Sequence, residues 1–223
     1  MKNLILALEN STNICSISIR YKKYYIEINN LKNIEKNNNE KILQNIDWLT
    51  FISKIKINDV KIISYNFGPG SFTGLRISSA ICQGLFFNKE KKIIRISSLQ
   101  IISQQIWEKY KKKKILVAIQ SKFNEIYICA YKFNLKKKII QPIIPEIIIN
   151  INNIKTLPIN FIYTGNSFFI KKIIKEKKKI FKSNKIRYPK IKYTIKLSKI
   201  LLNNNIITSI NNINPNYIIE NIF

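Results

Sequence analysis

The chain has 223 residues, of which 46% are apolar, so it is long enough for one large domain or two small ones with a substantial core. It carries a formal net charge of +27, three cysteines and no histidine. An odd number of widely spaced cysteines argues against a disulfide framework, and the missing histidines argue against a zinc site built from histidine and cysteine. The apolar runs are too short for an export signal or a membrane span, so we expect a cytoplasmic protein.

The positive charge has two competing explanations. A basic protein often binds nucleic acid, but this chain also contains 52 Ile and 29 Asn, a pattern typical of drift toward AT-rich codons, which would enrich Lys as well. Arginine, which suits planar phosphate recognition, is far rarer than lysine here. The lysine runs at 111–114, 136–138 and 171–179 are most simply solvated faces, although a weak, salt-sensitive attraction for RNA stays open.

The first half of the chain predicts three strands followed by alternating helices and strands. Short apolar runs separated by polar turns indicate a meander, and helical spacing of apolar residues then alternates with short apolar strands. The expected strands are 3–9, 14–20, 24–28, 60–66 and 93–96, and the expected helices are 40–54, 74–87 and 98–110.

After residue 114 the pattern begins again, with an apolar strand at 115–121, a turn and a second strand at 126–131. Three prolines between residues 139 and 160 predict an irregular connection there. A strand at 161–164 and helices at 166–176 and 193–203 complete the second half. Two βββαβαβα halves, 1–110 and a divergent 111–223, predict an α/β protein with the actin-like, sugar-kinase and Hsp70-like (ASKHA) fold.

The stretch from Gly68 to Arg76, GPGSFTGLR, is the most informative local feature. Three glycines and a proline in seven positions predict a tight turn between the strand and the helix that flank it, with Ser71 or Thr73 as the helix N-cap. Such a turn collects unpaired N–H groups that attract anions, yet its spacing matches neither a P-loop nor a dinucleotide fingerprint. A purely structural turn is an equally good interpretation.

The residues of this stretch resemble the signature GPGSFTG-[VL]-R of the TsaB (YeaZ) family, bacterial relatives of the threonylcarbamoyltransferase subunit TsaD. Residues 5–12 with Cys15 and Ser16 are similar to the family's opening, and residues 118–121 with 125–127 are similar to its AIDAR…GEVY segment. The resemblance covers roughly the first 130 residues, and the tail at 215–217 resembles the family only faintly.

The resemblance also sets expectations for catalysis. Nucleotide-hydrolysing members of this fold place a carboxylate at the end of the first strand of each half, to hold metal and water near the phosphates. Here those places carry Glu9 and Gln120, so we expect at most a degenerate site for ATP or ADP with magnesium, and a structural role for Glu9 is equally compatible. TsaD uses a histidine pair for its metal, so we expect this chain not to be catalytic alone. The candidate nucleotide-binding residues are Glu9, Gly68, Gly70, Ser71, Thr73 and Gly74.

A partner-binding role is the main functional prediction. In the family, the helices corresponding to 40–54 and 74–87 pair with those of TsaD, or with a second copy when TsaD is absent. Small residues in the second helix would permit a close approach. The candidate interface residues, which divide between core and interface, are Ile42, Ile46, Leu49, Ile77, Ser78, Ile81, Gly84 and Leu85.

The resemblance implies a scaffold subunit that acts with a TsaD-like catalyst and a TsaE-like ATPase. That complex transfers threonylcarbamoyl from its AMP adduct to N6 of adenosine 37 in tRNAs that read codons beginning with A. Two alternatives stay open: a self-sufficient nucleotide-dependent enzyme of the same fold that uses Glu9, and a tRNA-binding module that works through its lysines. For the scaffold, any contact with tRNA would be indirect, and no membrane is involved.

Overall fold

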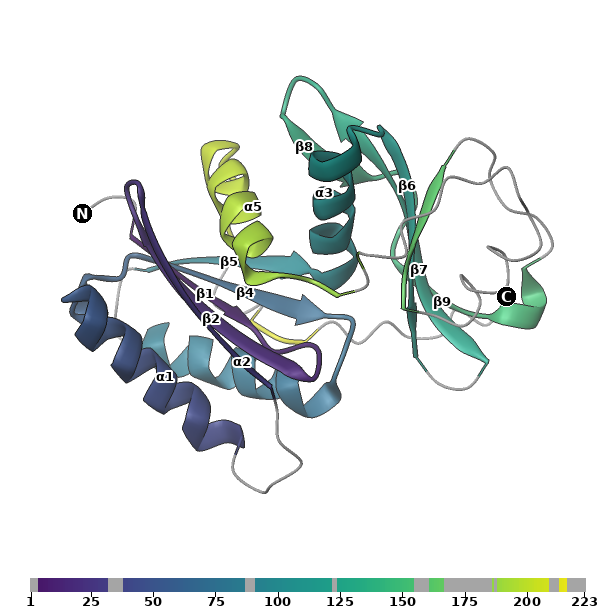
Figure 1. Cartoon of the computed structure of the whole chain (residues 1–223). Helices are drawn as coiled ribbons and strands as arrows, with labels where there is room; N and C mark the ends of the chain where they lie inside the picture. The colour runs from purple at the N-terminus through teal and green to yellow at the C-terminus, as the bar shows by residue number, and fades with distance from the viewer. Residues whose placement is uncertain are drawn as a thin grey trace. The chain divides into compact units, whose positions relative to one another are not determined.

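The structure is a computed structural model that describes residues 4–31, 38–86, 91–121, 124–154, 161–166, 186, 188–208 and 213–215. The chain divides into two compact units (Figure 1). Unit 1 comprises Met1–Ser97 and Lys190–Pro215, and unit 2 comprises Ser98–Pro189 and Asn216–Phe223. Among the helices described in these ranges, none is long and apolar enough to cross a membrane.

Unit 1 is built on a five-stranded sheet with the strand order β3-β2-β1-β4-β5. The first three strands form an antiparallel meander, and β4 and β5 extend the sheet in parallel with β1. Each parallel step needs a crossover, which α1 and the short helix η1 supply before β4 and α2 supplies before β5. The bounds are β1 Ile5–Glu9, β2 Ile14–Tyr21, β3 Tyr24–Leu31, α1 Asn38–Ser53, η1 Ile57–Asp59, β4 Ile62–Gly68, α2 Phe72–Phe86 and β5 Lys92–Ser97.

Successive residues at the start of the chain face opposite sides of this sheet. Leu4, Leu6 and Leu8 belong to an apolar core that includes residues of α1 and α2. Ala7, between them, packs instead against α5, Ile191–Asn203. Figure 1 shows α1 and α2 on one face of the sheet and α5 on the other. Unit 1 is therefore a three-layer α/β/α sandwich.

A row of small residues lies on the side of the sheet that α5 covers. Ala7 pairs in register with Ser18 of β2 and with Ser64 of β4, and all three are fully buried. Because these side chains are small, the helix can lie close to the strands, and Ile191 and Ile195 pack directly against Ala7. The row fixes how closely α5 approaches the sheet.

Unit 2 repeats the same plan around a second sheet of order β10-β6-β7-β8, in which β9 also pairs with β7. The strands β6 and β7 form an antiparallel hairpin, and β10 lies parallel to β6 on its other side. α3 packs its apolar face, which includes Leu99, Ile102 and Ile106, on this sheet. The bounds are α3 Ser98–Tyr110, β6 Lys114–Gln120, β7 Glu125–Asn134, β8 Ile139–Pro142, β9 Ile147–Asn150, η2 Ile151–Asn153 and β10 Ile162–Gly165.

This repeated topology confirms the predicted actin-like fold class. The prediction of an irregular connection over 139–160 is wrong at two places, where the strands β8 and β9 form. Pro142 is the last residue of β8 and Pro145 lies between the two strands, so neither proline interrupts the strand pairing. The expected helix over 166–176 lies outside the described residues, apart from Asn166.

The compact units and the predicted halves do not share their bounds. The predicted halves meet at residue 110, whereas α3 belongs to unit 2 because it packs on β6, β7 and β8. In the same way α5 belongs to unit 1. It packs on β1, β2, β4 and β5, although the stretch Ser98–Pro189 of unit 2 precedes it. Sequence order alone therefore does not define the units.

We expect Ala7→Leu to lower the free energy of unfolding by about 1–3 kcal/mol, because the larger side chain would force α5 away from the sheet. Urea denaturation of the purified chain measures this change. The matched control is Ala80→Leu on the exposed face of α2, which should stay within about 0.5 kcal/mol of the parent chain. Equal effects of the two substitutions would contradict the close packing at Ala7.

Candidate functional site

Glu9, at the carboxyl end of β1, is 1% exposed, and residues of its own chain hold it in place. Its Oε1 accepts hydrogen bonds from the backbone N–H of Ser11 at 3.0 Å and from the Ser11 hydroxyl at 2.6 Å. Its Oε2 accepts a hydrogen bond from the side-chain amide of Asn66 at 2.6 Å. Both carboxylate oxygens therefore already serve as acceptors within unit 1, as burial of a carboxylate requires.

Asn66, near the end of β4, links this carboxylate to the glycine-rich turn. Its Nδ2 also donates to the Ser11 hydroxyl at 2.9 Å, and its Oδ1 accepts from the backbone N–H of Gly68 at 2.9 Å. Asn66 is fully buried and is not among the residues that the sequence pattern predicts for the site. The available signal was a polar amide inside a mostly apolar strand, two residues before the glycine-rich turn.

The glycine-rich turn lies directly against the loop that follows β1. Ser71 donates its backbone N–H to the carbonyl of Ser11 at 2.8 Å, and the side-chain amide of Asn10 donates to the carbonyl of Gly74 at 3.0 Å. A Cβ atom added to Gly70 would lie 2.4 Å from the Ser11 carbonyl oxygen, which is closer than any real contact. Only glycine fits at position 70 without a shift of the backbone.

Ser71 caps α2 as the sequence predicts. Its hydroxyl accepts the backbone N–H of Gly74 at 3.4 Å, and its carbonyl accepts that of Leu75 at 2.9 Å. The structure thus brings the turn next to Glu9, with Ser11 and Asn66 between them. Of the candidate nucleotide-binding residues, Glu9, Gly68 and Gly74 are buried, and Gly70, Ser71 and Thr73 are exposed.

The two positions where related enzymes carry carboxylates do not suit a metal-bound nucleotide. Glu9 uses both oxygens within unit 1, which makes it a poor magnesium ligand. Gln120, in unit 2, is uncharged; its backbone N–H donates to Asn166 at 2.9 Å and its side chain donates to the carbonyl of Glu125 at 3.1 Å. The residues that the structure describes contain no group of three or more acidic, cysteine or histidine side chains placed to hold a metal ion. Nucleotide binding at the turn stays a prediction.

Cys82 and Cys129 are poor candidates for a nucleophile. All three cysteines are buried, and burial raises the pKa of the Cys82 thiol and that of the Cys129 thiol, the latter to about 12. A thiol with so high a pKa stays protonated and unreactive at neutral pH. With no histidine in the chain, a Ser/His or Cys/His pair is also impossible.

The structure divides the candidate interface residues of α1 in a way that the sequence could not. Ile42, Ile46 and Leu49 are buried in the core of unit 1, so they support the sheet and cannot reach a partner in this arrangement. The opposite surface of the helix exposes four large apolar side chains, among which Phe51 is 81% exposed. We call this surface the α1 apolar face; its members are Leu43, Trp48, Phe51 and Ile52.

The α2 candidates divide in the same way. Ser78 is buried, and Ile77, Ile81 and Leu85 are partly buried against the core. Gly84 is exposed, and a Cβ added to it would meet nothing within 4 Å. The structure therefore leaves room for another molecule at Gly84 but not at Ser78.

Comparison with known proteins shows the family. The model of the family described as TsaD, tRNA N6-adenosine threonylcarbamoyltransferase, matches residues 32–214. A relative from Buchnera aphidicola subsp. Schizaphis graminum, "tRNA threonylcarbamoyladenosine biosynthesis protein TsaB", is 35% identical over 196 residues, which cover 86% of this chain and 91% of the relative. The chain belongs to the TsaB family. The TsaB of Haemophilus influenzae is also 35% identical, over 128 residues that cover 57% of this chain and 53% of that protein.

Solved structures agree with the TsaB fold. "YeaZ from Pseudomonas aeruginosa" superposes with a TM-score of 0.80 at 18% sequence identity, covering 96% of this chain and 99% of that one. A second crystal structure, of an uncharacterized protein with similarity to peptidase YeaZ from Pseudomonas aeruginosa, reaches a TM-score of 0.83, also at 18% identity. At this identity the likeness establishes the fold.

We expect Gly70→Ala to destabilise unit 1 by about 2 kcal/mol or more, because the added methyl group would separate the turn from Ser11. The control is Gly84→Ala, which adds the same atom in open space within a helix and should leave stability unchanged or raise it by up to about 1 kcal/mol. Urea denaturation of both variants measures the difference. Indistinguishable variants would contradict the fit at Gly70.

Proposed function

We propose that this TsaB-family chain is a non-catalytic scaffold subunit in the biosynthesis of tRNA threonylcarbamoyladenosine. The names of its relatives support the pathway. The TsaD-family match supports a common origin with the transferase itself. Within that pathway the chain would support a TsaD-like catalyst, with a TsaE-like ATPase as the further partner.

The chemistry of the chain supports the non-catalytic part of this proposal. Glu9 is engaged within unit 1, Gln120 is neutral, and the Cys82 and Cys129 thiols are held protonated by burial. The chain contains no histidine that could bind the metal of the catalyst. Transfer of threonylcarbamoyl to N6 of adenosine 37 would therefore take place on the partner's residues.

The α1 apolar face is the observation that carries the partner-binding part. Trp48 and Phe51 are the kind of aromatic side chains that anchor interfaces, and both are exposed on α1, as are Leu43 and Ile52. In the isolated chain this face is exposed to water, and the hydration of apolar side chains is unfavourable in free energy. Burial of an aromatic side chain this exposed contributes roughly 1.5–3 kcal/mol, so a few such anchors suffice for a stable complex.

Gly84 gives independent support from α2. A glycine inside a helix costs about 1 kcal/mol relative to alanine, and this one has no neighbour in its own unit that would exclude a methyl group. A partner helix that approaches closely at this position would explain the glycine. α1 and α2 cover the same face of the sheet, so one partner surface can contact both (Figure 1). The proposed interface therefore consists of the α1 apolar face with Ile77, Ile81, Gly84 and Leu85.

Size-exclusion chromatography with light scattering tests the proposal, on the chain alone and mixed with the TsaD-like protein of its own organism. A modification assay on unmodified tRNA, read by nucleoside mass spectrometry, completes the test. We expect a stable hetero-complex, with tRNA modified only when both proteins and the ATPase are present. If the isolated chain turned over ATP, lost that activity in Glu9→Ala and formed no complex, the self-sufficient enzyme would replace the scaffold.

We expect Phe51→Glu to weaken the complex at least tenfold, because a charge would have to be buried at the interface. The matched control is Tyr24→Glu, which changes an aromatic side chain of similar exposure, 76%, at the start of β3. Both variants should keep the parent stability, since neither side chain is packed. Loss of affinity in both variants would show that added negative charge, and not the α1 apolar face, determines binding.

We expect Gly84→Leu to separate folding from binding. The variant should unfold at the same or a higher urea concentration than the parent chain, because leucine favours helix and has open space around it. Its affinity for the TsaD-like protein should fall at least tenfold, because the side chain would hold the partner helix away. A variant that bound as tightly as the parent would remove α2 from the interface.

A further inference from the structure

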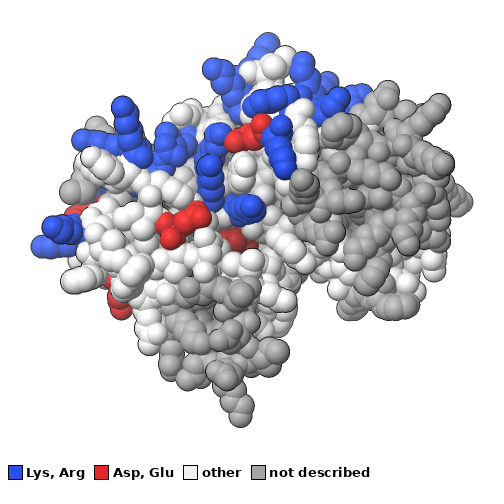
Figure 2. Space-filling model, in the orientation of Figure 1, with Lys and Arg blue, Asp and Glu red and all other residues white. Residues whose placement is uncertain are grey.

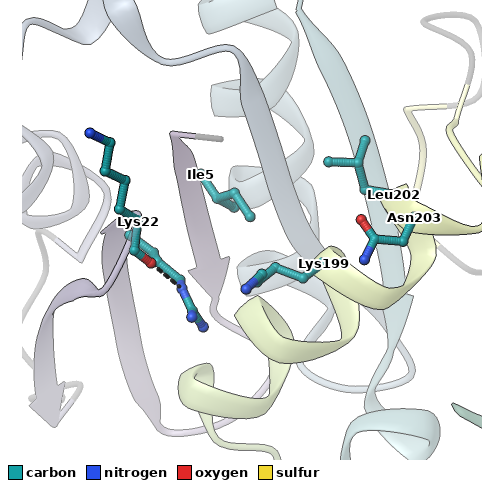
Figure 3. A pocket seen from close by; sticks show the side chains of 6 residues that line it. Ile5, Lys22, Lys199, Leu202 and Asn203 are labelled. Carbon is teal, nitrogen blue, oxygen red and sulfur yellow. Dashed lines mark hydrogen bonds between the residues drawn. The ribbon is translucent and has the colours of Figure 1, made fainter. Parts of the chain in front are cut away.

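A small cavity of about 120 Å³ lies in unit 1, on the side of the sheet away from α1 and α2. It opens between the strands of the meander and the C-terminal end of α5 (Figure 3). Its lining residues are Ile5, Arg20, Lys22, Lys199, Leu202 and Asn203.

Basic groups line this cavity from two different elements, and no acidic residue lines it. Arg20 enters from β2 and Lys199 from α5, and Figure 3 shows Lys199 extending from the helix toward the strands. The side chain of Lys22 runs away from the cavity in the same view, so Lys22 contributes its backbone there. Two cations therefore converge on one small space.

These two cations have unused hydrogen-bonding capacity. Arg20 donates its Nε–H to the Lys22 carbonyl at 3.4 Å, and its terminal amino groups make no hydrogen bond with the described residues. Lys199 is exposed and forms no ion pair or hydrogen bond in that same part of the chain. The nearest acid along β3, Glu27, already accepts hydrogen bonds from Tyr25 and Asn29. Positive charge at the cavity is thus not neutralised by a bonded carboxylate.

The carbonyl groups at the C-terminal end of α5 do not need Lys199 as a hydrogen-bond donor. Lysines near a helix C-terminus often bind its last carbonyl groups. Here the backbone satisfies them, since Asn205 donates to Leu202 at 3.0 Å and Ile206 donates to Leu201 at 2.9 Å, with Asn205 in the left-handed conformation at φ 57°. Lys199 therefore remains available to a ligand.

A row of lysines leads along α5 to the cavity. Lys192, Lys196 and Lys199 follow each other at helical spacing, are exposed, and have no acidic residue among the thirteen residues of the helix. Figure 2 shows that blue basic side chains are more widespread than red acidic ones on the visible surface of the described residues. These lysines attract an anion that approaches the cavity along α5.

We propose that this cavity binds a single phosphate group. Its volume suits one tetrahedral anion and is well below the roughly 300 Å³ of a site for a larger small molecule. The planar guanidinium of Arg20 can present paired N–H donors to two phosphate oxygens, Lys199 adds a point charge, and the Asn203 amide adds a neutral donor. The phosphate belongs either to a small molecule or to the backbone of an RNA strand that lies along the α5 lysines.

Two binding experiments on the full chain test this inference, with constant ionic strength within each titration and with the RNA titration repeated at several salt concentrations. Inorganic phosphate is titrated against a chloride background by calorimetry, and a fluorescent RNA hairpin is titrated by anisotropy. We expect Lys199→Gln and Arg20→Gln each to weaken binding at least tenfold, whereas Lys192→Gln, which removes the same charge from the same helix outside the cavity, weakens it less than threefold. Lys199 is exposed, so its variant should fold even if Arg20→Gln perturbs the β2–β3 turn.

The outcomes separate a site from general attraction to a basic protein. If the RNA is the ligand, inorganic phosphate competes with it, and Lys199→Gln lowers the slope of log affinity against log salt by about 0.7–0.9, the value for one phosphate contact. If phosphate alone binds and RNA does not, the source is a small molecule. Equal losses in Lys192→Gln and Lys199→Gln, or no binding of either probe beyond the chloride background, overturn the proposal.

Discussion

The contact of Gly70 with Ser11 is the constraint on which unit 1 depends. Because the turn lies directly on the loop after β1, Asn66 can bridge that loop and the end of β4, and Glu9 obtains the donors that a buried carboxylate needs. The same contact sets where α2 begins, through the cap at Ser71. Residues that in related enzymes would face a nucleotide are used here to hold two strands and a helix together.

The sheet of unit 1 has two chemically different faces, and this difference separates its proposed roles. On one side leucines and isoleucines form a continuous core under α1 and α2, whose outer surface offers the α1 apolar face. On the other side β1 presents Ile5, Ala7 and Glu9, and there Ala7 lies between Ser18 and Ser64 and packs against α5. A protein partner and an anionic ligand would therefore bind on opposite sides of the sheet and need not exclude each other.

Local patterns in the sequence predict much of this architecture, and what they miss is nonlocal. The spacing of Gly68, Gly70 and Gly74 after an apolar strand predicts the turn and the Ser71 cap, and short apolar runs predict the meander. Nothing local marks Asn66 as a bridge to Glu9, since its partners are more than fifty residues away. The helix α1 carries large apolar residues on both its buried and its exposed side, so periodicity could not separate its buried residues from Trp48 and Phe51. The return of α5 to unit 1 also has no signal in its own sequence.

Among the residues that the structure describes, five positions other than glycine adopt a left-handed backbone, with φ between 52° and 57°, and four of them are lysines. The fifth is Asn205, the residue that closes α5. A lysine in this conformation costs roughly 1 kcal/mol or more relative to glycine, so these turns reduce the margin by which the folded state exceeds the unfolded one. Two glycines stand where a side chain has no room, Gly70 against Ser11 and Gly165 against Ala118. At these five positions the fold thus carries a conformational penalty that glycine would remove.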